Sequence, residues 1–184
     1  MENLEKNELN IIRTIFSQET PTRPSLSQGT RLSLVKVSTL LSSLEKREYI
    51  HKDVKARQGI GRPSFEYKLS PKLGVAIGIS VGLDSFRILG MDSSKTNRFN
   101  RAYEIRLPLN PEEHVDFIIQ EVFLALEKTL DTLVKGESVI CIGMALPGMV
   151  DTRRGIWLQG LQLTGITHIN MAGIFKDRFH IPVF

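Results

Sequence analysis

Among the side chains of this 184-residue sequence, Lys and Arg give the clearest indication of a chemical role. Between Arg31 and Arg62 the chain has eight Lys and Arg residues against three Asp and Glu. Residues 1–73 carry a formal charge of +5 and residues 74–184 carry −1, which together give the +4 of the chain. A local cationic excess of this kind suits the neutralisation of phosphate groups, as nucleic-acid binding requires. A solvated surface with a chance excess of charge is the alternative.

Side chains for redox, metal or covalent chemistry are few. Cys141 is the single cysteine, so no disulfide can form within the chain. Its apolar neighbours, VICIGMAL, predict a buried structural thiol rather than a nucleophile. The four histidines, at positions 51, 114, 168 and 180, do not have the spacing of metal ligands. We therefore predict no metal and no cofactor.

Neither a membrane span nor a secretion signal is predicted. The longest run of apolar and small residues, 139–150, is far shorter than the roughly 20 residues that span a bilayer. The first ten residues are polar and acidic, whereas a secretory signal needs a basic segment followed by an apolar one. We expect a cytoplasmic protein with no membrane partner.

Three short helices are predicted in the basic part of the chain. Asn7 can cap the first, a second covers about residues 23–30, and Ser33 can cap the third. The third helix has apolar residues at the i, i+3, i+4, i+7 spacing of a buried face, namely Val37, Leu40, Leu41 and Leu44. Because short helices cannot bury such stripes separately, we expect the three to pack together.

A hairpin is predicted after the third helix. The strand-like segments IHKDVKA and SFEYKLS are separated by RQGIGRP, whose glycines and proline suit a hairpin loop. Three helices followed by a hairpin predict a winged helix-turn-helix over residues 1–73, in which the third helix enters a DNA major groove. The alternative is that any small helical domain with a hairpin has the same pattern.

The expected DNA contacts lie on two segments. The third helix would meet base edges with the side opposite its apolar stripe, where Leu34 also lies. On this side, Lys36 and Thr39 are our first choices for direct contacts with bases. The wing glycines let the backbone approach DNA, and a slender arginine can enter a narrow minor groove; a loop touching only solvent is the alternative. The predicted DNA-binding residues are Ser33, Lys36, Ser38, Thr39, Ser42, Arg57, Gly61 and Arg62.

The second half of the chain, residues 74–184, has the pattern of an α/β domain. Its alternating apolar residues predict three consecutive strands, which are followed by an amphipathic helix that Pro111 opens. The strand VICIGMALPG is apolar throughout and should be central in its sheet. The segment MAGIFKDRF predicts another helix, and IPVF would begin one more buried strand.

This combination resembles the ROK family of bacterial repressors and sugar kinases. The resemblance rests on TRPSLSQGTRLSLVKVSTLLSSLEKREYI, GIGRPSFEYKLSP, GVAIGISVGLDSFRILGMD, ALPGMVDTRRGIWL and FKDRFHIPVF. It implies an α/β protein with an N-terminal winged helix-turn-helix followed by a partial actin-like or sugar-kinase-like (ribonuclease H-like) lobe. The chain would then end within the first lobe of the ROK domain. Either it is a fragment of a longer product, or a partner supplies the missing surface.

The resemblance points to a repressor and not to a kinase. Family kinases place an aspartate and two glycines followed by threonine in the first hairpin, whereas this chain has Ser80, Gly82, Leu83 and Asp84 in that region. An aspartate near the phosphates of ATP would repel them. The general base and the zinc-binding cysteines of the family lie beyond residue 184. We therefore expect no enzyme activity.

The resemblance also suggests where an effector would bind. Family sugar ligands lie between two lobes, and the matching residues on this side are Gly148, Gln162 and Gly165. Relatives usually carry an asparagine and a glycine-tryptophan pair in the second stretch, where this chain has Gln162, Gly165 and Ile166. A sugar effector would bind if the cleft is completed, and ordinary loop residues are the alternative.

We predict from these features a sequence-specific, DNA-binding transcriptional regulator. The resemblance implies a repressor of sugar-utilisation genes that binds double-stranded operator DNA as a homodimer, without kinase activity. Part of the family's dimer surface would lie in the missing region. The competing hypothesis is an inactive remnant that acts only by association with a full-length homologue.

Overall fold

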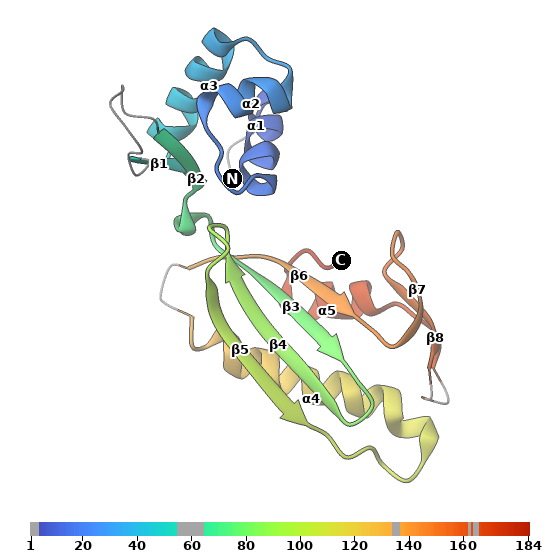
Figure 1. The fold of residues 1–184 in the computed structure, drawn as a ribbon. Coiled ribbons are helices and arrows are strands. Elements are labelled where there is room, and N and C mark those ends of the chain that lie inside the picture. The colour runs from blue at the N-terminus through green and yellow to red at the C-terminus, as the bar shows by residue number, and fades with distance from the viewer. Residues whose placement is uncertain (1–3, 55–64, 134–136, 162, 164–165) are drawn as a thin grey trace. The chain divides into compact units, whose positions relative to one another are not determined.

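The structure is a computed structural model that describes the chain except for residues 1–3, 55–64, 134–136, 162 and 164–165. The chain divides into two compact units, residues 1–73 and 74–184 (Figure 1). Each unit has a hydrophobic core of its own.

The N-terminal unit consists of three helices followed by an antiparallel pair of strands. Its elements are α1 (Lys6–Ser17), α2 (Arg23–Thr30), α3 (Leu34–Lys46), β1 (Ile50–Val54) and β2 (Phe65–Leu69). The predicted bounds of the second helix are confirmed. Thr22 caps α2 with its hydroxyl, which accepts a hydrogen bond from the Ser25 amide, and proline follows at the second helical position.

The core of this unit is the predicted apolar face of α3 together with α1 and α2. All four stripe residues of α3 are buried. They pack with residues from the rest of the unit, including Ile11, Ile15, Leu26, Tyr49 and Tyr67. The 3.6-residue period of α3 therefore orients the helix, with one side inward and the opposite side toward solvent.

The first helix begins earlier than its sequence pattern predicted. Its cap is Glu5 and not Asn7, because Glu8 turns back and accepts a hydrogen bond from the Glu5 amide at 3.1 Å. The Glu8 carboxylate is buried, and it also accepts hydrogen bonds from Arg47 Nη1 at 2.9 Å and Ser43 Oγ at 3.3 Å. Glu8 thus ties the start of α1 to the end of α3.

We expect the Glu8 cluster to make the stability of the N-terminal unit depend on pH. Burial alone would raise the pKa of Glu8, but the hydrogen bonds from the Glu5 amide and from Arg47, with the charge of Arg47, hold that pKa below its ordinary value. Because the folded pKa is the lower one, the stabilisation is complete above the unfolded pKa and is lost as the pH falls through the folded value. We expect Glu8→Gln to lower the free energy of unfolding at pH 7 by about 2 kcal/mol.

Urea unfolding at pH 7 and at pH 3, followed by far-UV circular dichroism, measures this effect. The difference between the wild type and Glu8→Gln should shrink at the lower pH. Glu19→Gln, a matched change at an exposed position, should have little effect at either pH. A Glu8→Gln deficit of the same size at both pH values would contradict the prediction.

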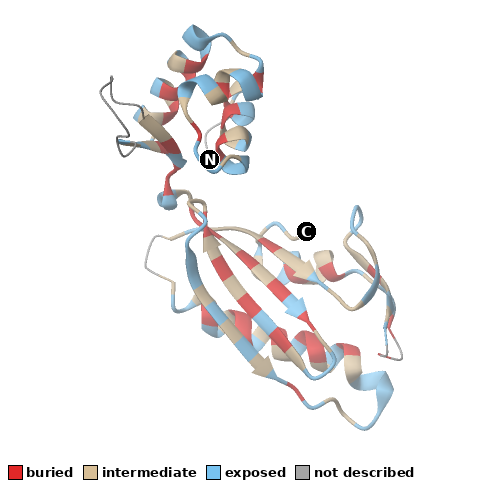
Figure 2. Cartoon of the chain, in the orientation of Figure 1, coloured by how far each residue is buried: buried red, intermediate tan, exposed pale blue. Residues whose placement is uncertain are grey.

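The C-terminal unit is built on a four-stranded sheet in the order β5-β4-β3-β6. Three antiparallel strands come first, and a short 3₁₀ turn and α4 then lead to β6, which runs parallel to β3. The α4 helix covers one face of this sheet, and buried residues alternate with less buried ones along β3 and β4 (Figures 1 and 2). The elements are β3 (Val75–Val81), β4 (Ser85–Asp92), β5 (Asn97–Glu104), α4 (His114–Leu130) and β6 (Val139–Ala145).

Strand β6 has partners on both sides, as its apolar sequence predicted. Beyond β3, it pairs with the last residues of the chain: Ile142 donates to the Pro182 carbonyl at 2.8 Å, and Phe184 donates to the Ile142 carbonyl at 2.9 Å. The sequence predicted that the last residues begin one more buried strand, and the prediction of burial was wrong. These residues form a single bridge, Ile142 to Val183, and the side chain of Phe184 is 75% exposed.

A second, three-stranded sheet follows, which the sequence patterns did not predict. It consists of β7 (Gly148–Asp151), β8 (Ile156–Gly160) and β9 (Thr167–Ile169), and helix α5 (Met171–Phe179) comes next, with the predicted bounds. Trp157 on β8 is fully buried, and its Nε1–H donates to the Pro147 carbonyl at 3.0 Å. This bond anchors the Pro-Gly turn that begins the hairpin.

None of the described helices combines the length and the apolar character that crossing a membrane requires.

Candidate DNA-binding surface

The outer side of α3 collects most of the predicted DNA-binding residues. Ser33 caps the helix as predicted, and its Oγ accepts a hydrogen bond from the Lys36 amide at 3.2 Å. Lys36, Thr39 and Ser42 are exposed, whereas Ser38 is half-buried at the margin of this side. The capped helix therefore presents Lys36, Thr39 and Ser42 together toward solvent.

Two of the hydroxyl groups on α3 are already engaged with the helix backbone. Ser38 Oγ donates to the Leu34 carbonyl at 2.8 Å, and Thr39 Oγ1 donates to the Val35 carbonyl at 3.1 Å. In this arrangement both oxygens can still accept hydrogen bonds, but their protons are used. Compared with Ser38 and Thr39, Lys36 is therefore the stronger donor for the acceptor atoms of guanine.

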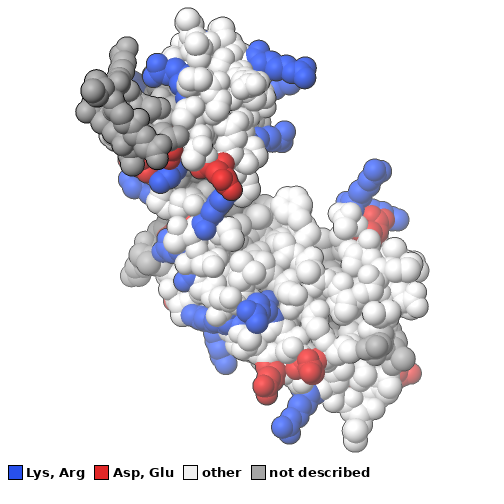
Figure 3. All heavy atoms as spheres, viewed as in Figure 1, with Lys and Arg blue, Asp and Glu red and all other residues white. Residues whose placement is uncertain are grey.

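Unpaired cations flank the exposed side of α3. Arg31, Lys36 and Lys46 are exposed and form no ion pair within the described residues. Glu45, by contrast, is held by Lys52 at 2.9 Å. In Figure 3, Lys and Arg side chains project from the helical part of this unit. Such a surface is free to neutralise phosphate groups.

The predicted wing contacts lie outside the described residues. Arg57, Gly61 and Arg62 fall within residues 55–64. The strands that carry the loop pair from Ile50 with Leu69 to Val54 with Phe65. The hairpin strands are thus confirmed, and the roles of the three loop residues stay predictions.

The structure adds an apolar residue to the exposed side of α3 that the sequence interpretation missed. Val35 is 78% exposed, and its neighbour Leu34 is 52% exposed. Val35 precedes Thr39 by four residues and Ser42 by seven, so the three share one side of the helix. Extending the helical period backward from Thr39 would have identified it.

Gly148, a predicted effector residue, has a structural reason to be glycine. Its φ is +113°, and a Cβ atom at this position would lie 2.1 Å from the Gln159 carbonyl oxygen and 2.7 Å from the Leu161 amide. The close pairing of β7 with β8 therefore excludes any side chain here. The other two predicted effector residues, Gln162 and Gly165, lie outside the described residues.

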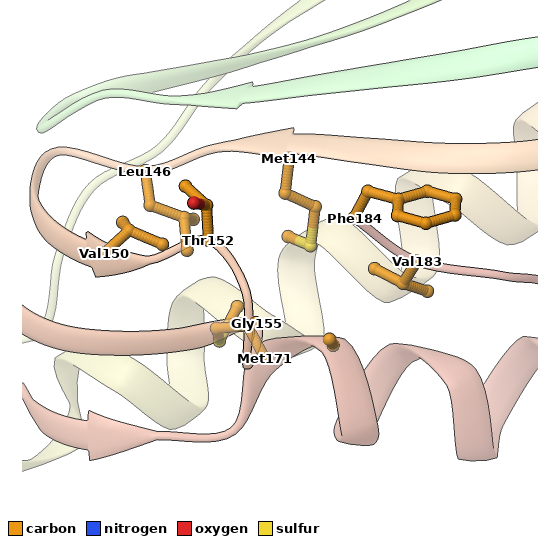
Figure 4. A pocket seen from close by; sticks show the side chains of 9 residues that line it. Met144, Leu146, Val150, Thr152, Gly155, Met171, Val183 and Phe184 are labelled. Carbon is orange, nitrogen blue, oxygen red and sulfur yellow. The ribbon is translucent and has the colours of Figure 1, made fainter.

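An apolar pocket lies between β6, the β7–β8 hairpin, α5 and the last residues of the chain (Figure 4). Thr152 provides the hydroxyl in its lining, and the side chains around it are otherwise apolar. Sugar recognition needs several convergent polar groups, so this pocket does not suit a sugar. Its lining residues are Met144, Leu146, Val150, Thr152, Gly155, Met171, Ala172, Val183 and Phe184. No group of three or more His, Cys, Asp or Glu that could hold a metal occurs among the described residues.

In the first hairpin of the C-terminal unit, polar groups of the turn form hydrogen bonds with one another. The Gly82 amide donates to the Ser85 carbonyl at 2.8 Å, so it does not point freely toward a ligand. Asp84 is exposed at the turn, and its carboxylate accepts a hydrogen bond from Ser85 Oγ at 3.0 Å. A bound phosphate would meet this negative charge.

Comparisons with known proteins place this fold. No family model matches the chain. A curated relative, the xylose repressor of Caldicellulosiruptor bescii, is 21% identical over 178 residues, which cover 97% of this chain and 44% of the repressor. The crystal structure of a ROK family transcriptional regulator, described as a homologue of the E. coli MLC protein, matches with a TM-score of 0.64 and 17% identity over 97% of this chain and 44% of that one.

A glucokinase from Parabacteroides distasonis also matches, with a TM-score of 0.51 and 16% identity over 60% of this chain and 30% of that one. The chain therefore has the mixed α/β fold of ROK proteins, as predicted. Its resemblance to the ROK repressors is confirmed. The chain spans less than half the length of the curated repressor and of the ROK regulator.

Proposed function

We propose that this protein is a sequence-specific, DNA-binding transcriptional regulator. The observation that carries the proposal is α3, a capped helix whose apolar side is buried and whose opposite side is exposed and cationic. An α2–turn–α3 arrangement followed by a hairpin is the order in which winged helix-turn-helix proteins place a recognition helix in the major groove. The likeness to a xylose repressor supports a repressor of sugar-utilisation genes.

The proposed regulator has no kinase activity. Catalysis of phosphoryl transfer depends on donors and cations that approach the phosphates. In the first hairpin, the Gly82 amide is used within the turn and Asp84 adds a negative charge. Both features oppose ATP binding there, which supports a regulatory role and not a catalytic one.

The operator in this proposal is double-stranded DNA with two related half-sites. Winged helices that read a palindrome act as dimers, with half-sites separated by about one helical turn or a multiple of it. We therefore propose a homodimer on DNA. A sugar effector, if one acts, would bind near Gly148, Gln162 and Gly165.

A binding experiment tests the proposal directly. The chain is used to select duplexes from a random library, and the recovered duplex is compared with a scrambled duplex of the same composition at moderate salt. The selected duplex should bind at least tenfold more tightly than the scrambled one. Equal and weak binding of both would reject sequence-specific regulation and favour the remnant that associates only with a homologue.

Lys36 and Thr39 should set the sequence preference. Each of Lys36→Ala and Thr39→Ala removes a group that can meet a base edge, and a good base contact is worth about 1 to 3 kcal/mol. We expect a 5- to 150-fold weaker affinity, roughly, for the selected duplex, together with a changed preference in a repeated selection. Lys6→Ala, the same change on exposed α1, should leave the preference intact. Unchanged preference in both α3 variants would show that another surface reads the bases.

A further inference from the structure

The first turn of α3 exposes two adjacent apolar side chains to solvent. Val35 is 78% exposed and Leu34 is 52% exposed. Valine is a weaker helix former than alanine or lysine because its branched Cβ restricts χ1. Helix formation alone therefore does not account for valine at this position.

Val35 lies beside the residues that face a DNA partner in the proposed function. The hydrogen bond from Thr39 Oγ1 to the Val35 carbonyl, at 3.1 Å, places Thr39 one turn above it. Because that bond uses the Thr39 proton, this strip of the helix offers methyl groups more readily than hydrogen-bond donors. The strip that carries Val35 and Thr39 is therefore suited to contact an apolar group in an otherwise polar groove.

The charges around Val35 identify the partner as a polyanion. Arg31 lies just before α3, Lys36 follows Val35 directly, and both are exposed. Glu45, near the other end of the helix, is paired with Lys52. An apolar protein surface would have to desolvate these cations, whereas DNA phosphates neutralise them.

We propose that Val35 is a specificity-determining residue that contacts the C5-methyl group of a thymine in the major groove. This inference rests on the proposed function of the same helix. The thymine methyl is the apolar group that marks an A·T pair in the major groove, and residues at the start of a recognition helix are the ones that reach base edges. The stiff, short valine side chain presents two methyl groups at that point.

Replacement of thymine by uracil removes the methyl group and leaves base pairing intact, so it tests the contact directly. The probe is the duplex that the full chain selects from a random library, synthesised with deoxyuridine at each thymine position in turn. The wild type should bind about fourfold more weakly at one or two positions in each half-site, since one buried methyl group is worth about that factor. Val35→Ala should bind the thymine duplex more weakly and lose its sensitivity to uracil at those positions.

Two further variants separate Val35 from its neighbours. Thr39→Ser removes only the threonine methyl and should keep the uracil sensitivity of the wild type. Leu9→Ala, which shortens an exposed apolar residue on α1, should do the same. A selected duplex that is insensitive to uracil, or one whose sensitivity survives in Val35→Ala, overturns the inference while specific binding stands. Failure to select any duplex instead overturns the proposed function itself.

Discussion

Gly148→Ala should lower the free energy of unfolding of the C-terminal unit by about 3 kcal/mol or more. Two costs add here. The φ of +113° is strained for any residue with a side chain, and the new Cβ would lie 2.1 Å from the Gln159 carbonyl oxygen. The two atoms nearest the new Cβ, the Gln159 carbonyl oxygen and the Leu161 amide nitrogen, belong to the backbone. No side chain can therefore rotate away to relieve the clash. The pairing of β7 with β8 must shift instead.

The single tryptophan of the chain makes this measurement specific. Trp157 is fully buried on β8, the strand that pairs with β7, so its fluorescence follows unfolding of this region in urea. Gly143→Ala is the matched control: it changes the same residue type in β6, where a new Cβ would have its nearest neighbour at 4.0 Å. That variant should stay within about 1 kcal/mol of the wild type. Equal stability of Gly148→Ala and Gly143→Ala would contradict the structural role of Gly148.

The result bears on the effector hypothesis as well. A variant of Gly148 that fails to respond to a sugar is uninformative if the hairpin has shifted. Effector binding is therefore better tested with Gln162→Ala, which removes a side chain that can hydrogen-bond a sugar hydroxyl. The sequence resemblance pointed to both residues, and the φ of Gly148 gives that glycine a structural role that is independent of any ligand.

The elements that were predictable from the sequence have strong local signals. Each of these signals lies within a few turns of one helix. They are the Ser33 cap, the four-residue apolar stripe of α3 and the proline near the start of α2. The β7–β9 sheet escaped prediction because its strands are three to five residues long and depend on pairing between segments. The cap of α1 was missed for a related reason, since Glu8 is fixed by Arg47, 39 residues away.

At the candidate site, too, the sequence pattern predicted the position of residues but not the contacts that they make. The helical period places Lys36, Thr39 and Ser42 on the exposed side of α3, and the structure agrees. The period cannot tell how a hydroxyl is used, and the bonds of Ser38 and Thr39 to the helix backbone change what these residues can offer to a base. Val35 was not among the residues predicted on the outer side, although its position, four residues before Thr39, places it there and it is 78% exposed.

Leu44→Ala should destabilise the N-terminal unit and thereby lower the temperature at which DNA binding is lost. Leu44 is fully buried in the core of that unit, and such truncations cost about 2 to 5 kcal/mol. A unit of this size is stable by only about 4 to 11 kcal/mol, at the usual value per residue. The variant therefore loses a large part of its stability, and the fraction of chains with a formed α3 falls near physiological temperature.

Two signals in one chain test this prediction. Far-UV circular dichroism should show an N-terminal transition at lower temperature, and affinity for the selected duplex should fall in step with the folded fraction as the temperature is raised through that transition. The urea transition reported by Trp157 should be unchanged, because Trp157 belongs to the other hydrophobic core. Leu9→Ala makes the same chemical change at a residue that is 39% exposed, so it should preserve both folding and binding. If the Trp157 transition weakens together with DNA binding in Leu44→Ala, the two units unfold as one, and the loss of binding can no longer be assigned to the N-terminal unit alone.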